Sequence, residues 1–518
     1  MEKQSHNRVV FKTYNQNQLM LIPPSLEELI KPNHPVRTLN SIIDRLDLEN
    51  LVNEYDGGGA SSYHPRMLLK VLVYGYLCNI YSSRKLEDAV RENIHFMWLA
   101  GMNTPDHHTI NRFRSERLKE NIKDLFSQVV LLLAEAGMIS LKEIYTDGTK
   151  IEANANKYSF VWGKSIRFNK TRMISQLKEL WRYTQQVAQN ELMEPEPDFG
   201  SLSPEELEAA ITRISKSLKA AEVDDQELKK KRLQKLNYAK RHWPGKVNEY
   251  EEQERQLGER NSFSKTDPDA TFMRMKEDHM KNGQLKAGYN LQFSTHNQCI
   301  LHFSLHQNPT DTTTLIPHLE SFSALYGFLP TTITADAGYG SEENYVWLEA
   351  KNIEGYVKYN YFHKEQREAS KQKPKLLDPN TLHYDAYGDR YICPMGQEMT
   401  LAFVRKRKTA TDYEQTTKTY QARNCSGCPL AASCHPVYGR ANITVNHTLH
   451  RLKAQARRLL LSPEGVRKRK QRGVDVEPVF GQLKHNKNFK RFRLKGLQKA
   501  GIEIGLAAMA HNIAKLAG

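Results

Sequence analysis

The spacing of hydrophobic and polar positions changes near residue 140. Before that point the apolar residues fall in helix-like runs, and the clearest is Tyr63–Leu77, which is mostly apolar and is expected to be a buried helix. From Lys142 onward the pattern alternates, as in Glu143–Asp147, which is typical of a strand. The sequence therefore predicts an all-helical N-terminal domain, residues 1–138, followed by an α/β domain.

The alternating segments follow the order strand, hairpin, helix, strand, helix, strand. The first strand is predicted to stop in a turn at Asp147-Gly148, because Asp-Gly commonly marks a turn. The later elements are expected at residues 288–294 and 299–304 for the hairpin, then 312–325, 331–336, 342–350 and 355–359. This order predicts a ribonuclease H-like catalytic core, a mixed sheet with flanking helices.

Two insertions are expected to interrupt this core. In residues 165–265, apolar positions recur at three-and-four spacing among many charges, which predicts an antiparallel helical hairpin or a short coiled coil. Ser203-Pro-Glu-Glu206 has the pattern of a capping box and marks a helix start. The second insertion contains cysteines. The predicted domains after residue 138 are 139–360, the first part of the core with insertion 165–265; 361–460, the Cys-containing insertion; and 461–518, the rest of the core.

Charge narrows the class of partner. The chain has 75 Lys and Arg against 59 Asp and Glu, a net charge of +16, which favours a polyanion, and nucleic acid before membrane. Residues 451–500 hold 16 Lys or Arg against 3 acids, a balance of 16 − 3 = +13. The N-terminus shows no secretory signal, and no apolar run is long enough for a bilayer. A cytoplasmic protein that binds no membrane is expected.

Three acids in distant segments carry the candidate chemistry. Asp147 and Asp336 are predicted to close two core strands, and Glu477 lies on a late helix. Taken singly, each has an ordinary explanation, a turn for the aspartates and a surface helix for the glutamate. Together they are expected to meet at one edge of the sheet, where carboxylates suit Mg²⁺ (or Mn²⁺). Two such ions, about 3.5–4 Å apart, can activate a water or 3′-hydroxyl at a phosphodiester.

Basic residues flank the third acid. Lys484 follows Glu477 by two helical turns and is expected on the same face, where it can hold a DNA phosphate. Further DNA contacts are expected nearby at Arg472, Lys487 and Arg491.

A second basic segment lies in the N-terminal domain. Asp106 is a candidate N-cap, and Arg112, Arg114 and Arg117 are expected to project from the following helix, with Arg112 and Arg114 as DNA contacts. A helix-turn-helix reader and a helical bundle with an ordinary charged face both fit these residues.

Four motifs resemble those of a known family. Tyr145–Asn156, Ala335–Gly340 and Val476–Lys484 resemble the three motifs of bacterial insertion-sequence DDE-type transposases, and His64–Arg114 resembles their InsH-type N-terminal domain. The resemblance implies a metal-ligand triad at Asp147, Asp336 and Glu477, with Lys484 as a DNA contact.

The chain departs from the family pattern just before the glutamate. Many relatives carry a tyrosine there and an arginine four positions upstream of the glutamate. Here that position is Gly473, its neighbour is Arg472, and the tyrosine has no match. The departure concerns the handling of a flipped base or hairpin end rather than the triad.

The cysteines suggest a separate metal. Cys425-x₂-Cys428-x₅-Cys434, with Cys393 upstream, offers four thiolates for a structural tetrahedral Zn²⁺, and His435 is an alternative fourth ligand. Unrelated thiols in a loop are the other interpretation, because only one pair has the tight two-residue spacing.

The sequence thus favours a transposase that binds double-stranded DNA at its terminal inverted repeats, cleaves a strand at each end and joins the 3′-hydroxyl to target DNA. A homodimer is expected, because two ends must be brought together. Two alternatives remain open: a ribonuclease H-like nuclease or resolvase that cuts without joining, and a cleavage-inactive DNA-binding protein derived from a transposase.

Overall fold

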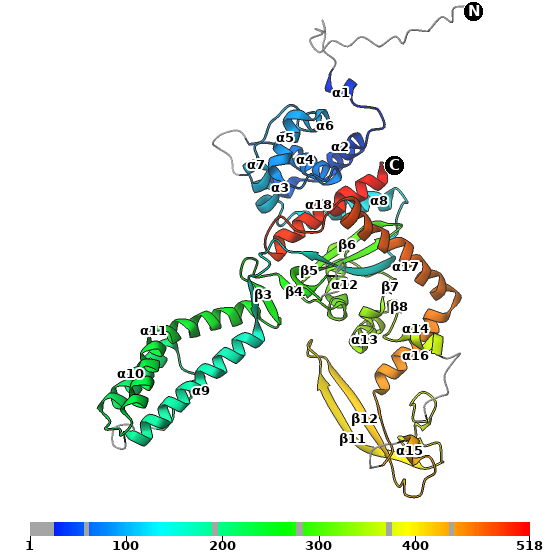
Figure 1. The fold of residues 1–518 in the computed structure, drawn as a ribbon. Coiled ribbons are helices and arrows are strands. Elements are labelled where there is room, and N and C mark those ends of the chain that lie inside the picture. Colours follow the sequence, from blue (N-terminus) through cyan, green and yellow to red (C-terminus); the bar gives the residue numbers. More distant parts are fainter. Residues whose placement is uncertain are drawn as a thin grey trace, which may run out of the picture.

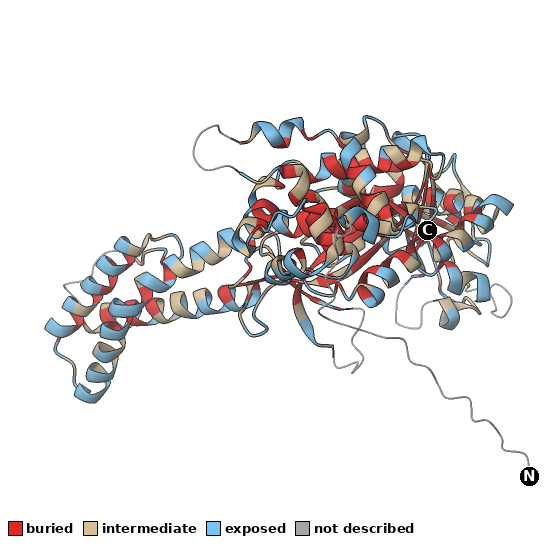
Figure 2. Cartoon of the chain, turned by 90° about the horizontal axis from the view of Figure 1, so that it is seen from above, coloured by how far each residue is buried: buried red, intermediate tan, exposed pale blue. Residues whose placement is uncertain are grey.

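The computed structural model describes residues 25–55, 62–188, 195–275, 283–368, 376–434 and 440–517. A mixed α/β body lies at its centre, and two appendages extend from it, a helical arm and a module with a long β-ribbon (Figure 1). Buried residues concentrate in the body, whereas the arm is largely exposed along its length (Figure 2). None of the helices in these ranges has the length and apolarity needed to cross a membrane.

A six-stranded mixed sheet forms the centre of the body. Five of its strands lie side by side in the order β6-β5-β1-β7-β8, and the short strand β4 (Thr271–Arg274) pairs with the start of β5. Strand β5 is antiparallel to its neighbours, whereas β1, β7 and β8 run parallel. The bounds are β1 Glu143–Glu152, β5 Leu285–His296, β6 Cys299–His306, β7 Thr332–Ala335 and β8 Glu354–Val357.

The predicted order of core elements is confirmed, including α12 (Leu315–Tyr326) and α13 (Glu342–Ala350) between the strands. The predicted end of the first strand is wrong. Strand β1 continues through Asp147, which pairs with Phe293, and Gly148, which pairs with Gln292. A Cβ on Gly148 would lie 2.5 Å from the Gln292 side chain, so the glycine allows a close approach within the sheet and does not mark a turn.

Side chains that alternate along the strands contact different helices on the two faces of the sheet. On β6, Phe303 packs against Phe126 of α8 (Ile122–Glu135), whereas the ring of His302 lies 4.8 Å from that of His318 on α12. The face with Phe303 and Phe293 is covered by α17 (Pro463–Gly481) and α18 (Leu497–Leu516), and α12 covers the other. Because Asp147 pairs with Phe293, its side chain points toward α17.

The N-terminal helices share one core with the sheet. Helix α4 (Pro65–Leu77) confirms the predicted buried helix and packs with α8 against the last helix, α18 (Figure 1). The remaining helices here are α1 Leu26–Leu29, α2 Pro35–Arg45, α3 Glu49–Asn53, α5 Ser83–Glu92, α6 Ile94–Leu99 and α7 His107–Arg112. A π-helix, Phe113–Arg117, continues α7.

In its described residues the helical arm contains three helices, whereas the sequence pattern predicts an antiparallel helical hairpin or a short coiled coil. They are α9 (Gly163–Val187), α10 (Pro204–Ala220) and α11 (Gln226–Leu257), and they enclose a core of their own. The predicted capping box at the start of α10 is confirmed. The paired strands β2 (Phe160–Trp162) and β3 (Ser262–Ser264) close the base of the arm.

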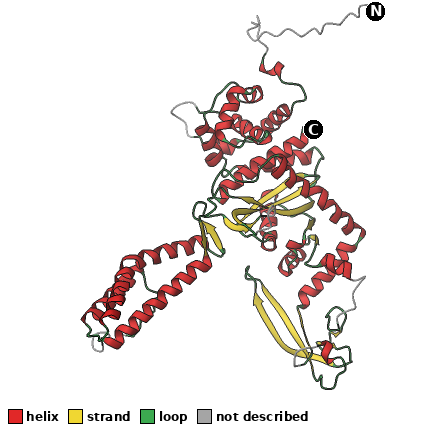
Figure 3. Cartoon of the chain, viewed as in Figure 1, coloured by secondary structure: helices red, strands yellow, loops and turns green. Residues whose placement is uncertain are grey.

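The Cys-containing segment forms a second sheet of antiparallel strands in the order β13-β12-β11-β10-β9. Strands β11 and β12 extend beyond the others as a two-stranded ribbon (Figure 3). The bounds are β9 His383–Asp385, β10 Arg390–Ile392, β11 Glu398–Lys408, β12 Glu414–Ala422 and β13 Asn442–Val445, with α14 Phe362–Glu368 before them, α15 Ala431–Cys434 between β12 and β13, and α16 His447–Leu461 after them.

Candidate active site

Strand register brings the two aspartates together. Strands β1 and β7 are parallel, and their last paired residues are Thr146 and Ala335. Asp147 and Asp336 each follow directly, so they lie at the same level of the sheet on neighbouring strands. The Asp147 side chain is 14% exposed and that of Asp336 is 48% exposed. Asp147 therefore lies within strand β1 and Asp336 just beyond strand β7, on adjacent strands.

Short-range hydrogen bonds orient both carboxylates. Asp147 Oδ1 accepts from its following backbone N–H, that of Gly148, at 2.8 Å. Asp336 is the N-cap of a short 3₁₀-helix, Ala337–Tyr339, and its Oδ1 accepts from the Ala337 N–H at 2.7 Å.

Helix α17 carries Glu477 across the same face of the sheet. Buried Asp475 accepts a hydrogen bond from the Thr295 hydroxyl at 2.6 Å, and the ring of Phe480 stacks on Phe293 with 5.2 Å between centroids. These contacts fix the helix to β5 on both sides of Glu477. Because Phe293 pairs with Asp147, this part of α17 lies over the first acid.

Arg472 joins two of the three acids. Its Nη1 lies 3.0 Å from Asp147 Oδ2, and its Nη2 lies 3.3 Å from Glu477 Oε1. The guanidinium side chain is 9% exposed, whereas that of Glu477 is 59% exposed. One cation thus holds two carboxylates from segments more than 300 residues apart. The sequence predicts a DNA contact for Arg472, but in the structure its guanidinium group is paired with Asp147 and Glu477.

The remaining acid, Asp336, has a cation of its own. Lys358 Nζ, just after strand β8, lies 3.7 Å from Asp336 Oδ1. Burial lowers the pKa of Lys358, and the Asp336 carboxylate opposes that shift. Nearby, the fully buried Tyr339 hydroxyl donates to Gln292. Burial raises the pKa of the Tyr339 hydroxyl, and the negative charges of Asp311 and Asp147 raise it further.

Asp311 is a fourth carboxylate beside this site that the sequence did not point to. Its Oδ1 accepts from Asn290 at 2.8 Å and from Gln292 at 3.0 Å. A Cβ on Gly148 would lie 2.8 Å from Asp311 Oδ1 and one on Gly338 3.4 Å from its Oδ2, so Asp311 touches both aspartate-bearing segments. Its sequence context, Asn-Pro-Thr-Asp, is an ordinary loop signal, and no local pattern places that loop against β1.

The donor set suits a hard divalent cation. Carboxylate oxygens are the ligands that Mg²⁺ prefers, and Asp147 and Glu477 already share one positive charge. In the ranges that the structure describes, no three His, Cys, Asp or Glu side chains are gathered so that they could hold a metal ion as they stand. A metal ion at these acids would therefore have to replace the contacts of Arg472.

Most of the other predicted basic residues of this region point inward. Lys484 is 4% exposed and lies in a π-helix, Gln482–Asn486, that continues α17. The predicted spacing of two α-helical turns from Glu477 is therefore not kept. Lys487 donates to the Leu77 carbonyl of helix α4, and burial lowers its pKa. Arg491 is exposed and donates to the carbonyls of Ala153 and Ala155 at 3.2 and 2.8 Å.

The expectation that Arg114 projects from its helix is wrong. Its side chain is buried and donates to the Tyr81 carbonyl at 2.6 Å and to Asn111 at 3.0 Å. It also lies close enough to the buried Glu503 for its charge to lower the pKa of that acid, which burial raises. The π-helix at Phe113–Arg117 rotates successive side chains away from the α-helical period, and this turns Arg114 inward.

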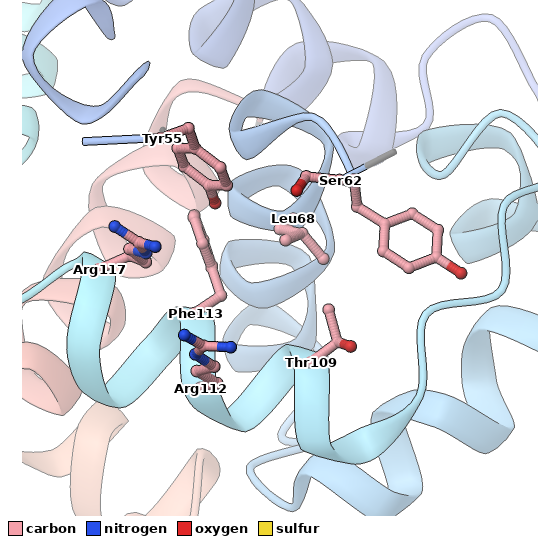
Figure 4. A pocket seen from close by; sticks show the side chains of 8 residues that line it. Tyr55, Ser62, Leu68, Thr109, Arg112, Phe113 and Arg117 are labelled. Carbon is pink, nitrogen blue, oxygen red and sulfur yellow. The ribbon is translucent and has the colours of Figure 1, made fainter. Parts of the chain in front are cut away.

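Arg112 lies at the surface beside a hollow of about 350 Å³ (Figure 4). Arg112 and Arg117 come from one helix, and Tyr55 lies across from them (Figure 4). The Arg117 guanidinium lies over the Tyr55 ring, 4.8 Å from its centroid, and donates to the Glu54 carbonyl. Arg112 is 3.4 Å from Glu116. Two guanidinium groups on one wall make this hollow attractive to an anion.

The structure also gathers the four late cysteines around one small cavity, although they come from three segments. His435, the alternative fourth ligand, lies outside the described residues. Of the remaining two cysteines, Cys299 is buried and Cys78 is exposed.

Comparison with known proteins gives two family matches. Residues 392–517 match the model described as Transposase DDE domain, and residues 24–116 match the model described as Transposase domain (DUF772). The first range includes Glu477, Arg472 and the four late cysteines, and the second covers most of the N-terminal helices. No curated protein and no solved structure matches the chain.

Proposed function

Because the chain belongs to the DDE-type transposases and carries their DUF772 N-terminal domain, we propose that it cuts and joins DNA at Asp147, Asp336 and Glu477. It would bind the ends of its insertion sequence, hydrolyse one strand at each end and transfer the 3′ end to target DNA. The observation that carries the proposal is that the two aspartates lie at the same level on adjacent parallel strands while Arg472 contacts both Asp147 and Glu477.

The strand order β6-β5-β1-β7-β8, with β5 the antiparallel member, supports assigning the body to the ribonuclease H-like fold. In such a sheet, residues at the carboxyl ends of parallel strands meet at one edge. A helix packed on the same strands can supply a third acid, and we propose that α17, which contacts β1, β5 and β7, supplies Glu477.

The three acids would hold two Mg²⁺ (or Mn²⁺) ions. When bound, such ions activate a water or 3′-hydroxyl and stabilise the leaving oxygen of a phosphodiester. Before that, the single positive charge of Arg472 lies between Asp147 and Glu477 and reduces the repulsion of the two carboxylates. Once released from the acids, the Arg472 guanidinium could form a bidentate contact with a DNA phosphate.

The predicted DNA-contacting residues outside the three acids differ in how far they are exposed. Arg491 and Arg112 are at the surface and can reach phosphates as they stand. Lys484, Lys487 and Arg114 face the interior, so their charges would act on DNA only after a rearrangement, and Arg114 is better explained as the counter-ion of Glu503. We further propose a homodimer, because synapsis requires two DNA ends in one complex.

The test is a combined cleavage and joining assay. Purified protein is incubated with a labelled duplex taken from the DNA flanking its gene, a target plasmid and Mg²⁺. Wild type should yield nicked ends and joined product, and Glu477→Gln should yield neither. The matched control is Glu464→Gln, an acid on the same helix that pairs with Arg467, and it should behave as wild type. Nicking without joining would favour a nuclease, and end binding without nicking would favour a cleavage-inactive protein.

A further inference from the structure

The four late cysteines lie around a single cavity of about 20 Å³. Cys393 follows strand β10, Cys425 and Cys428 follow β12, and Cys434 ends α15. All four are free thiols, and Cys393, Cys425 and Cys434 border the small apolar core of this module. Packing alone does not require that all four side chains lining this cavity be cysteines, because any small apolar residue could fill the space.

The backbone around two of these sulfurs is shaped for a thiolate. The N–H of Gln397 donates to Cys393 Sγ and the N–H of Ala441 donates to Cys425 Sγ, both at 3.4 Å. The first turn closes through Gly396, whose φ of +79° is a conformation that favours glycine. Hydrogen bonds to sulfur stabilise its charged form, which is the form that binds metals.

We propose that Cys393, Cys425, Cys428 and Cys434 bind one structural Zn²⁺ as a tetrahedral tetrathiolate site. Soft thiolates in a closed four-ligand set select zinc over the hard cations that carboxylates bind. Within the described ranges these side chains are not gathered tightly enough to hold a metal ion as they stand, so binding would close them on the ion by side-chain rotation. Each thiol that becomes a ligand releases its proton to water.

The site would fix the base of the β11–β12 ribbon. Cys393 lies just before β11 begins and Cys425 just after β12 ends. One ion would therefore hold the two strands together at the base of the ribbon (Figure 3). The module around it has only a small buried core, which is the setting in which a metal supplies folding energy. At its other end the ribbon touches helix α13, where the Tyr413 hydroxyl lies 3.3 Å from Glu342.

The direct test is the metal content of the full chain purified without added metal. Elemental analysis should give about one zinc per wild-type chain, as expected for one Cys₄ site. Replacing the zinc with Co²⁺ should produce the strong visible and near-ultraviolet bands of tetrahedral cobalt thiolate. Wild-type protein that contains no zinc and gives no such bands on titration with Co²⁺ would overturn the proposal.

Two variants locate the ion. Cys425→Ser should lose the zinc and the cobalt bands, whereas Cys78→Ser, an exposed thiol far along the chain from the cluster, should keep both. Limited proteolysis should then cut Cys425→Ser, and wild type treated with a strong chelator, within residues 376–434, while the body resists. Retention of zinc by Cys425→Ser would contradict this ligand set. The outcome is independent of cleavage activity, because the triad lies elsewhere.

Discussion

Asp147→Asn is expected to lower the rate of strand cleavage at saturating Mg²⁺ by at least about a thousand-fold, since a metal-ligand contact contributes several kcal/mol at the transition state. The substitution keeps the size of the side chain and the hydrogen bond from Gly148 to Oδ1. It removes the charge that Arg472 binds at Oδ2 and that a metal would require. The loss should therefore appear in chemistry and not in DNA binding.

The comparison that isolates this effect uses Asp224→Asn, an exposed acid of the helical arm. Cleavage is followed in a single turnover with end DNA, and binding of the same DNA is measured by gel shift. Asp224→Asn should match wild type in both measurements. Cleavage by Asp147→Asn within tenfold of wild type would remove Asp147 from the triad.

Arg472→Gln is expected to lower the free energy of unfolding in EDTA by about 3 kcal/mol, because removing one partner of a buried ion pair leaves the other charge unpaired. The cost comes mainly from Asp147, which is nearly buried, and little from Glu477, which is more than half exposed. Mg²⁺ should restore much of this stability, since the ion can take the place of the guanidinium. The variant should also bind Mg²⁺ more tightly than wild type.

This prediction is checked by urea unfolding in EDTA and in Mg²⁺, with Mg²⁺ affinity measured by calorimetry. Lys470→Gln, an exposed position on the same helix, controls for the loss of a positive charge. An equal response of Arg472→Gln and Lys470→Gln to Mg²⁺ would mean that Arg472 does not occupy the metal position.

The periodic parts of the fold could be predicted from the sequence. Alternation identified strands β5 to β8, and the capping box at Ser203 identified the start of α10, because each signal is local. Helix α11 was missed, because few of its residues are apolar and its charges resemble a solvated segment. The end of β1 was misplaced, because a glycine needed for close contact with Gln292 has the same local signature as a turn.

The site could be predicted as a set of residues but not as a geometry. The resemblance to family motifs predicts Asp147, Asp336 and Glu477, and strand order predicts that the aspartates approach. No local signal indicates that Arg472 would lie between two acids, because that contact joins segments more than 300 residues apart. The inward turn of Arg114 depends on a π-helix, which side-chain periodicity does not reveal.

The most direct test of the central claim, that these acids act by binding metal, is metal rescue at Asp336. A thiolate is a poor ligand for Mg²⁺ and a better one for the softer Mn²⁺. Asp336→Cys should therefore be inactive in end cleavage with Mg²⁺ and regain cleavage with Mn²⁺, while Asp336→Ala stays inactive with both. Cleavage by Asp336→Ala in Mg²⁺, or a loss in Asp336→Cys that Mn²⁺ leaves unchanged, would contradict the assignment.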